Sequence, residues 1–229
     1  MNTVMSAGRH HAWRRMSVDV AFGEQSSPNT KTRMMKNTGS VGPALDIATG
    51  TGDLALTLAR ETKVTGVVGI DPVPEMLTLA LNKTKKHRLA HRVDYIIGDA
   101  HDLPFPDGKF ACATTGFGVR NFVNVPRALS EMVRVVRPGG NVVVLEIVRT
   151  ESRGLLKHIL PFYFRQIMPW FGAMLAGDRE AYTYLPESVQ GFLSASELAC
   201  SMHVVGLRNI SIRKLALGTV AIINGEKTK

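Results

Sequence analysis

Glycines and acidic residues lie close together in the stretch 44–54, which reads ALDIATGTGDL. Asp46 ends a short apolar run, Gly50 and Gly52 follow it, and Asp53 opens a helical pattern. This order predicts a buried parallel strand, a tight turn, and a helix whose free N–H groups face a ligand. Glycines suit the turn because they allow positive φ and a close approach of a ligand to the backbone. A strand-to-helix turn without any ligand is the alternative interpretation.

The turn fits two classes of cofactor. Gly50, Gly52 and Ala55 match the G-x-G-x-x-G/A pattern of dinucleotide sites, and Asp71 lies at a suitable distance to bind a ribose. S-Adenosylmethionine requires a similar glycine turn and a similar acid. It has no pyrophosphate, however, and its ammonium and sulfonium groups favour acidic neighbours.

The distribution of acids distinguishes these two classes. Asp46 and Asp53 flank the glycines, where they would repel a pyrophosphate. Asp99 follows a further predicted strand, where it can bind an adenine amino group. The acids therefore favour the methyl donor over NAD, and the sequence contains no Tyr-x-x-x-Lys pair that would support a dehydrogenase.

Predicted strands and helices alternate along the chain around this turn. The alternation predicts an α/β fold with a Rossmann-like, doubly wound, mostly parallel sheet and a C-terminal antiparallel hairpin. After the first strand, further strands are expected at 65–71, 93–98, 110–115 and 141–146, helices at about 53–60, from Pro72, at 125–136 and at 194–205, and the hairpin at 210–214 and 217–223.

Acidic residues end or follow four of the predicted strands: Asp46, Asp71, Asp99 and Glu146. Ligands of doubly wound sheets bind beyond the carboxyl ends of the strands, near the point where the strand order reverses. We therefore expect all four acids to project into the ligand site. The segment 137–140 (RPGG) is interpreted as a sharp break before the last of these strands.

Two segments lie outside this predicted core. Residues 1–42 combine a helical pattern with a polar connector, and they are interpreted as a cover on the substrate side. Residues 43–229 are expected to form the cofactor-binding domain, with an apolar and aromatic helical insertion at about 151–190. Prolines and charged residues divide the insertion into short amphipathic pieces. A core-packing helix pair and a lid over an apolar substrate or membrane face are the alternatives.

The composition excludes several other functions. The 229 residues are 45% apolar and 21% charged, as in soluble globular proteins, and the formal net charge is +9. The basic residues are scattered without interleaved aromatic residues, so nucleic acid is not expected as a partner. Cys112 and Cys200 lie far apart without metal-ligand spacing, and no metal is expected. No stretch has the ~18 uncharged apolar residues of a membrane-spanning helix.

Several motifs carry a family resemblance. The stretch 46–52 (DIATGTG), Asp71 and 98–100 (GDA) resemble the first motifs of class I S-adenosylmethionine-dependent methyltransferases. Further motifs extend over nearly the whole chain: Met1-Asn2-x-x-Met5-Ser6-x-x-x-His10-x-x-Trp13, Phe117-Gly118-Val119-Arg120-Asn121, 134–146 (RVVRPGGNVVVLE) and Tyr182-x-Tyr184-Leu185-x-Glu187-Ser188. With these motifs the chain resembles, more specifically, the ubiquinone/menaquinone biosynthesis C-methyltransferase family.

The family resemblance implies methyl transfer from S-adenosylmethionine to a ring carbon of a polyprenylated quinol, either demethylmenaquinol or the benzoquinol of the ubiquinone pathway. It implies that Thr51 and its glycines hold the methionine part of the cofactor, that Asp71 binds the ribose, and that Asp99 and Ala100 bind the adenine. The expected cofactor-binding residues are Asp46, Gly50, Thr51, Gly52, Asp71, Asp99, Ala100 and Gly116, the last of which stands where the family usually has Ser.

The implied reaction requires a nucleophilic ring carbon, which forms when a neighbouring quinol hydroxyl loses its proton to a base or a bound water. Arg120 and Asn121 are the candidate catalytic pair, and they would position that water or the developing phenolate. His10, His101 and Tyr184 are weaker candidates. The expected substrate-binding residues are His10, Phe117, Tyr182 and Tyr184.

Family members usually have Tyr-Asp directly before the Met-Asn that is Met1-Asn2 here, so a shortened cover or a misassigned start is expected. The expected partners are the polyprenylated quinol, a membrane surface, and a second copy of the chain or a biosynthetic complex. The expected location is the cytoplasm with peripheral attachment at the inner membrane, on the matrix side of mitochondria in a eukaryote. A non-catalytic cofactor-binding member of such a complex and an NAD-dependent dehydrogenase are the alternative functions.

Overall fold

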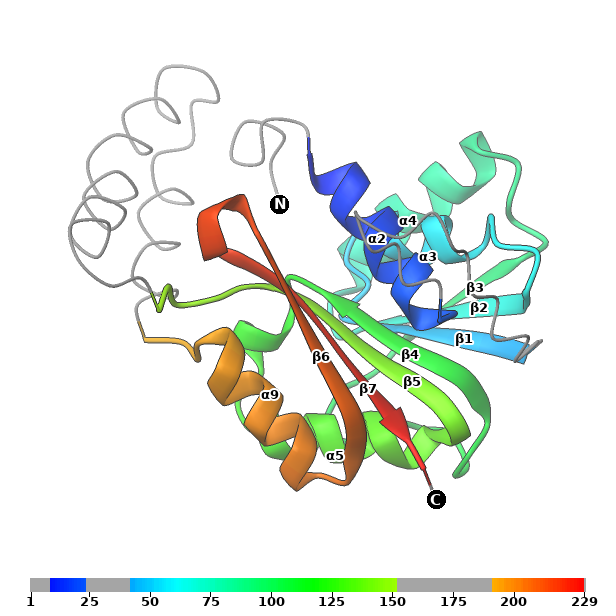
Figure 1. The fold of residues 1–229 in the computed structure, drawn as a ribbon. Helices are drawn as coiled ribbons and strands as arrows, with labels where there is room; N and C mark the ends of the chain where they lie inside the picture. The colour runs from blue at the N-terminus through cyan, green and yellow to red at the C-terminus, as the bar shows by residue number, and fades with distance from the viewer. Residues whose placement is uncertain (1–8, 24–41, 152–190, 229) are drawn as a thin grey trace, which may run out of the picture.

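The computed structural model describes residues 9–23, 42–151 and 191–228. The strands in these segments form one seven-stranded sheet with the order β3-β2-β1-β4-β5-β7-β6 (Figure 1). Strands β1 to β5 pair in parallel, and β7 is antiparallel to both of its neighbours. The strands are β1 (Gly42–Ile47), β2 (Val64–Asp71), β3 (Val93–Ile97), β4 (Phe110–Gly116), β5 (Val136–Ile147), β6 (Leu207–Leu215) and β7 (Val220–Lys227).

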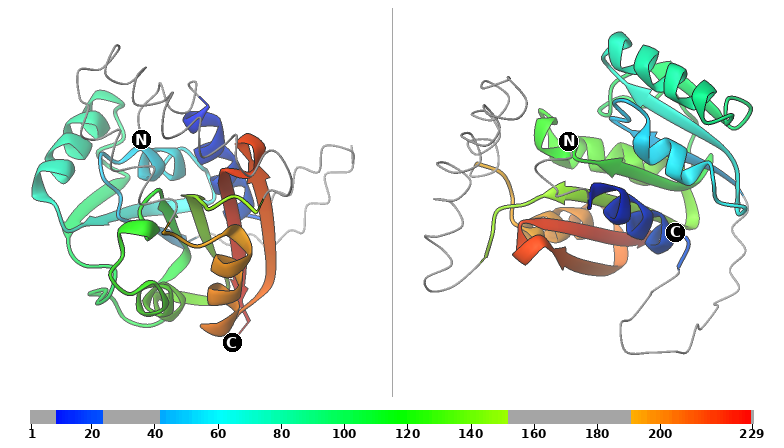
Figure 2. Two further views of the ribbon diagram at one scale, coloured as in Figure 1. Left: turned by 90° about the vertical axis from the view of Figure 1, so that its left-hand side faces the viewer. Right: turned by 90° about the horizontal axis from the view of Figure 1, so that it is seen from above.

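Helices cover both faces of the sheet (Figures 1 and 2). Helices α5 and α9 pack on one face, and α2, α3 and α4 lie on the other. The bounds are α2 (His10–Ala21), α3 (Asp53–Leu58), α4 (Pro74–Lys86), α5 (Val125–Val135) and α9 (Ala195–Val204), with short 3₁₀ turns η1 (Val119–Asn121) and η3 (Ala216–Gly218). This architecture confirms the predicted fold class.

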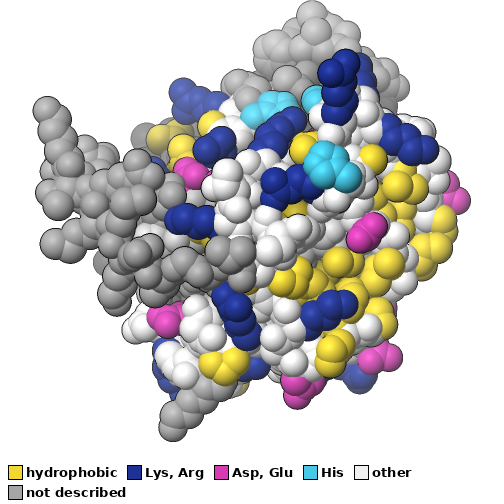
Figure 3. All heavy atoms as spheres, turned by 90° about the vertical axis from the view of Figure 1, so that its right-hand side faces the viewer, with side chains coloured by type: hydrophobic (Ala, Val, Ile, Leu, Met, Phe, Trp, Pro, Cys, Tyr) yellow, Lys and Arg dark blue, Asp and Glu magenta, His cyan; other side chains and the backbone are white. Residues whose placement is uncertain are grey.

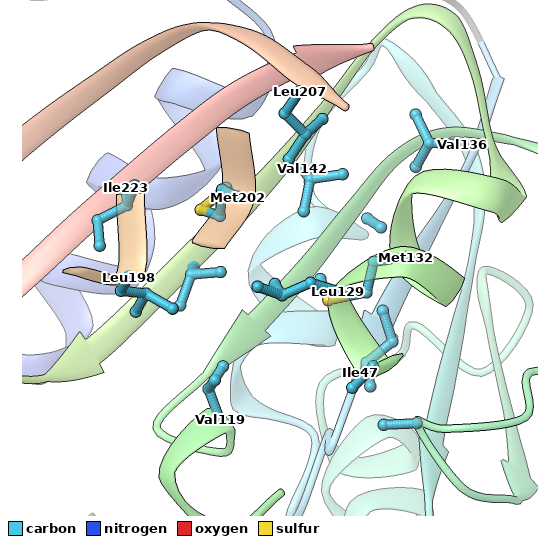
Figure 4. Close-up of a cluster of buried hydrophobic side chains, with 14 of the residues drawn as sticks. Ile47, Val119, Leu129, Met132, Val136, Val142, Leu198, Met202, Leu207 and Ile223 are labelled. Carbon is cyan, nitrogen blue, oxygen red and sulfur yellow. The ribbon is translucent and has the colours of Figure 1, made fainter. Parts of the chain in front are cut away.

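One part of the core lies between the sheet and helices α5 and α9 (Figure 4). Leu129 and Met132 on α5 and Leu198 and Met202 on α9 are all fully buried there. Their spacing along each helix puts them on one face, as the amphipathic pattern requires. Burying each such side chain stabilises the fold by about 1.5–3 kcal/mol relative to leaving it exposed.

Helix α2 packs on the opposite face, beside the turn that follows β1. Trp13, Val18 and Ala21 are buried in a cluster that includes Leu54 of α3 and Leu145 of β5. The helix therefore brings residues from the N-terminal part of the chain next to the predicted ligand site.

The sharp break predicted at 137–140 is wrong. Strand β5 already begins at Val136, which pairs with Phe110, and the register then shifts so that Asn141 pairs with Cys112. Gly139 adopts a φ of +77° within this irregular part of the strand. Between these two pairs β5 contains more residues than β4, so β5 forms a bulge there. The residue types of this bulge are also those of a turn, so the sequence alone does not distinguish the two.

Two other expectations are affected by where the described elements lie. The second strand of the hairpin begins at Val220 rather than 217, because residues 216–218 form η3. The predicted insertion at 151–190 lies outside the described residues, except for Glu151. None of the helices in the described segments is long and apolar enough to cross a membrane.

Candidate cofactor and catalytic site

A cavity of about 630 Å³ lies at the carboxyl ends of the parallel strands. The strand order reverses between β1 and β4, and residues from the ends of both strands line the cavity, which therefore lies at the topological switch point of the sheet. Seven of the predicted cofactor-binding residues line it: Asp46, Gly50, Thr51, Asp71, Asp99, Ala100 and Gly116.

Gly52 is the predicted cofactor residue that does not line the cavity. It precedes α3 with a φ of +79°, and a Cβ at this position would collide with the hydroxyl of Tyr95. Gly50 also has a positive φ, +54°, but among the described residues no atom beyond its two chain neighbours lies within 4 Å of its Cβ position. Gly52 therefore allows Tyr95 to pack closely against the turn, whereas Gly50 adds no side chain to the cavity wall.

Asp46 lies near the end of β1 as a buried carboxylate. Its Oδ2 accepts a hydrogen bond of 2.6 Å from Thr49 Oγ1, and its Oδ1 accepts one of 3.0 Å from Thr114 Oγ1. Burial raises the pKa of Asp46 to about 6, although these hydrogen bonds and the charge of Arg14 oppose the rise. A ligand ammonium in the cavity would stabilise the ionised form of this carboxylate.

Asp71, at the end of β2, holds two turns of the site together. Its Oδ2 accepts a hydrogen bond of 2.8 Å from the N–H of Gly50, and its Oδ1 accepts one of 3.0 Å from the N–H of Val73, just before α4. Each carboxylate oxygen has a further lone pair, so Asp71 can also accept hydrogen bonds from the hydroxyls of a ribose.

Asp99 and His101 form a braced pair in the turn after β3. Asp99 Oδ1 accepts hydrogen bonds of 2.9 Å from the backbone N–H and 2.6 Å from Nδ1 of His101, and these bonds lower the pKa of Asp99. Nε2 of His101 accepts a hydrogen bond of 3.1 Å from the N–H of Asn124. Both ring nitrogens of His101 are engaged, so this histidine braces Asp99 and is not free to act as a base.

Glu146 differs from the other strand-end acids, and the expectation that it projects into the ligand site is wrong. Its side chain is 0% exposed, and Oε1 accepts a hydrogen bond of 3.1 Å from Arg120 Nη1. Oε1 and Oε2 also accept the backbone N–H groups of Ile147 and Arg120. Burial raises the pKa of Glu146, and Arg120 partly offsets this rise. Neither Glu146 nor Arg120 lines the cavity.

Phe117 and Asn121, which lie before and after Arg120 in the chain, do reach the cavity. Phe117 adopts a φ of +63° after β4, and Asn121 ends the 3₁₀ turn η1; both line the cavity. The N–H of Phe117 donates to the carbonyl of Leu145 at 2.7 Å, and the N–H of Asn121 donates to that of Gly118 at 3.0 Å. Arg120, bound to Glu146, therefore anchors a turn whose flanking side chains face the ligand space.

Of the other predicted substrate residues, the structure describes only His10. His10 is buried in α2, with its ring 4.0 Å from that of His11, and it does not line the cavity. Tyr182 and Tyr184 lie outside the described residues. In the segments that the structure covers, no group of three or more His, Cys, Asp or Glu side chains is arranged to hold a metal ion.

A cluster of charged residues beside the β1–α3 turn was not predicted from the sequence. Lys83 Nζ donates to Asp53 Oδ1 at 2.7 Å and to Thr51 Oγ1 at 2.9 Å, and Arg14 Nη2 lies 3.4 Å from Asp53 Oδ2. Burial alone would raise the pKa of Asp53, but Lys83 and Arg14 lower it overall. Sequence patterns gave no signal for this cluster, because its members come from three different helices.

The residues present fit S-adenosylmethionine. A buried acid at the end of β1, an acid at the end of β2, and an exposed acid beside Ala100 follow one another along one cavity. No phosphate-binding cluster of cations accompanies them in the described part of the cavity wall, where Arg14 is the cation present. This arrangement favours a cofactor with cationic groups over a pyrophosphate.

The comparison with protein families gives a match along almost the whole chain. The sequence pattern of the ubiE/COQ5 methyltransferase family matches residues 1–227. A demethylmenaquinone methyltransferase of Thermus thermophilus is 37% identical over 227 residues, covering 99% of this chain and 94% of the relative. The ubiquinone/menaquinone biosynthesis C-methyltransferase UbiE of Geotalea daltonii is 36% identical over 228 residues, covering 99% and 90%.

Solved structures show the same fold at lower sequence identity. A SAM-dependent methyltransferase from Aquifex aeolicus matches with a TM-score of 0.63 and 17% identity, covering 96% of this chain and 92% of that chain. The [4+2]-cyclase SpnF matches with a TM-score of 0.65 and 21% identity, covering 93% and 81%. Because one of these proteins is a cyclase, the fold alone does not determine the reaction.

Proposed function

The chain belongs to the ubiE/COQ5 methyltransferase family, and we propose that it methylates a ring carbon of a polyprenylated quinol. It is an S-adenosylmethionine-dependent methyltransferase. The names of the relatives make demethylmenaquinol the first substrate to test and the benzoquinol of the ubiquinone pathway the second. The two alternatives, non-catalytic cofactor binding and an NAD-dependent dehydrogenase, have no support from these relatives.

One observation supports the proposal most: a single cavity joins the acidic strand ends to the turn that carries Phe117 and Asn121. The acids suit the cofactor, and the aromatic rings of Phe117 and Phe122 suit a planar apolar ring in the same space. Gly116 contributes no side chain there, so the cavity between the two regions stays open.

When bound, S-adenosylmethionine supplies an electrophilic methyl group on its sulfonium. The chain's own contribution would be to hold a quinol ring in line with that group and to exclude water. Asn121 would donate an amide hydrogen bond, directly or through a water, to the quinol oxygen as the quinol proton passes to a base or a bound water. Arg120 would act as a positioning residue, because its guanidinium is bound to Glu146 behind the turn.

The test is a methyl-transfer assay with labelled S-adenosylmethionine and short-chain analogues of each quinol, with extraction and mass analysis of the products. We expect labelled product in at least one arm and a loss of about 100-fold in kcat for Asn121→Ala. Cofactor binding without a labelled product in either arm would contradict the proposal. An unchanged kcat in Asn121→Ala would remove that residue from the mechanism.

We also propose that the cavity mouth contacts a membrane surface, from which a polyprenylated quinol would enter. Val73, Met76 and Val123 line the cavity and are exposed, Val123 to 97%. Figure 3 shows the opposite side, on which β1 and β3 begin, and there too lysine and arginine side chains lie among hydrophobic ones. The formal net charge of +9 would favour anionic lipid.

Co-sedimentation with anionic and neutral vesicles tests this contact. We expect binding to anionic vesicles that weakens in high salt and in a Met76→Ser/Val123→Ser variant. Failure to bind either type of vesicle would exclude the proposed surface.

The location of the protein, the segments that cover its substrate side and its oligomeric state are also part of the proposal. We propose a cytoplasmic protein attached at the inner membrane, with residues 1–42 and the insertion at 151–190 as covers of the substrate side. Light scattering would decide between a single copy and the proposed homodimer or larger complex.

A further inference from the structure

Arg14 of helix α2 places a guanidinium in the cavity wall beside the β1–α3 turn. Its side chain is 8% exposed, and it lines the cavity together with Asp46 and Asp53. The guanidinium carbon also lies 5.9 Å from the centroid of the Phe117 ring, which favours a fixed cation there. A permanent positive charge therefore reaches the cofactor space from a helix that precedes the cofactor-binding domain in the sequence.

The hydrogen-bonding capacity of this guanidinium is not used up by Asp53. Nη2 of Arg14 lies 3.4 Å from Asp53 Oδ2, whereas the shorter contact of Asp53 is the one of 2.7 Å with Lys83. Nη1 of Arg14 is buried, and it has no hydrogen-bond partner in the described segments. An unpartnered N–H of a buried charged group is unfavourable, so an acceptor supplied by a ligand at this point is stabilised.

The position of Arg14 suits the methionine end of the cofactor. That end carries an ammonium and a carboxylate on the same carbon atom. Asp46 presents a buried carboxylate to the ammonium, and Arg14 presents the opposite charge on the same cavity wall. A guanidinium also matches the planar, two-oxygen geometry of a carboxylate better than a lysine ammonium does.

We propose that Arg14 binds the methionine carboxylate of S-adenosylmethionine through Nη1, which makes helix α2 part of the cofactor site. This inference shares the cofactor with the proposed function, but it does not depend on a quinol as the substrate. Asp46 and Arg14 together then distinguish an α-amino acid from other groups that a nucleoside can carry.

The experiment compares two ligands that differ only in this carboxylate. Isothermal titration calorimetry would measure the affinities of S-adenosylmethionine and of decarboxylated S-adenosylmethionine for the full chain and for Arg14→Met. In the unmodified protein we expect S-adenosylmethionine to bind roughly 10- to 100-fold more tightly, as expected for charge-assisted hydrogen bonds. In Arg14→Met we expect this preference to be lost, with the affinity for the decarboxylated ligand unchanged or higher.

Arg15→Met is the matched control, because Arg15 is the next residue on α2, is 61% exposed, and pairs with Asp19 and Glu61. It should keep the full preference, and Arg14→Lys should recover part of it. Equal affinities of the two ligands in the unmodified protein would overturn the proposal, and this comparison requires no variant. A parallel loss of both affinities in Arg14→Met would show that Arg14 only supports the fold.

Discussion

The ends of strands β1 and β5 each bury a carboxylate, but the two acids have different partners. Asp46 is held by the hydroxyls of Thr49 and Thr114 and lines the cavity. Glu146 is bound by the guanidinium of Arg120 and by backbone N–H groups, and it does not line the cavity. Burial raises the pKa of both acids.

From this difference we propose that Asp46 is a ligand-binding acid and that Glu146 is a structural one. Neutral hydroxyls orient Asp46 without neutralising it, so its charge is available to a cationic ligand. Arg120 neutralises Glu146 inside the protein, and the pair fixes the turn that carries Asn121. A strand-end position therefore does not assign the function of an acid, whereas the identity of its hydrogen-bond donors does.

Arg120→Met should give the largest effect, because it removes the cation from the end of β5. Leaving Glu146 buried without its partner should lower the free energy of unfolding by about 3–5 kcal/mol. Arg120 opposes the rise in the pKa of Glu146, so this pKa should rise further in the variant. The loss of stability should therefore be larger at about pH 8 than at about pH 5, where the carboxyl takes up a proton.

Urea unfolding at both pH values measures this loss. Arg15→Met serves as the control, because this exposed arginine pairs at the surface and should contribute only about 0–1 kcal/mol. Equal losses in the two variants would show that the buried pair at the end of β5 has no special structural role.

The affinity for S-adenosylhomocysteine, the product that the cofactor forms, should depend on pH because Asp46 titrates. The ionised carboxylate, which dominates above the pKa of about 6, attracts the ligand ammonium, and the protonated form does not. The affinity for S-adenosylhomocysteine should therefore fall as the pH drops below this pKa, by roughly 10- to 100-fold in total, and level off above it. Calorimetric titrations at several pH values should show this fall in affinity in the unmodified protein. If the same fall persists in Asp46→Asn, a group other than Asp46 causes it.

Thr49→Val should give a smaller effect at the same site. It removes the 2.6 Å hydrogen bond from Thr49 Oγ1 that favours the ionised form of Asp46. The pH midpoint of cofactor affinity should move upward by about one unit. Thr78→Val, which removes an exposed hydroxyl on α4, should leave the midpoint unchanged, and an equal shift in both variants would exclude a direct effect on Asp46.

Most of the sheet was predictable, because buried parallel strands appear as continuous apolar runs bounded by turn residues. The start of β5 was not, since Pro138 and Gly139 are typical of turns. Pairing of Val136 with Phe110, which is remote in the sequence, extends the strand across this segment. Local propensity cannot report such a contact.

The site shows the same division between local and remote information. The topology of a parallel sheet brings Asp46, Asp71 and the turn of Asp99 together, so their spacing in the sequence was informative. Glu146 also ends a strand, so the sequence predicted it to reach the ligand. Its ion pair with Arg120 was not predictable, because Arg120 was interpreted as a catalytic residue. Arg14 gave no signal, because the docking of α2 beside the β1–α3 turn depends on packing between distant segments.

Parallel measurements on Asp46→Asn and Glu146→Gln test the central distinction most directly. Each variant would be titrated with S-adenosylhomocysteine and unfolded in urea. We expect Asp46→Asn to lose roughly 10- to 100-fold in affinity with little loss of stability, since its amide oxygen can still accept from one threonine hydroxyl and its NH2 group can donate to the other. Glu146→Gln should lose several kcal/mol of stability, about 3 or more, and at most a few-fold in affinity. Losses of the same kind and size in both variants would contradict the distinction between the two strand ends.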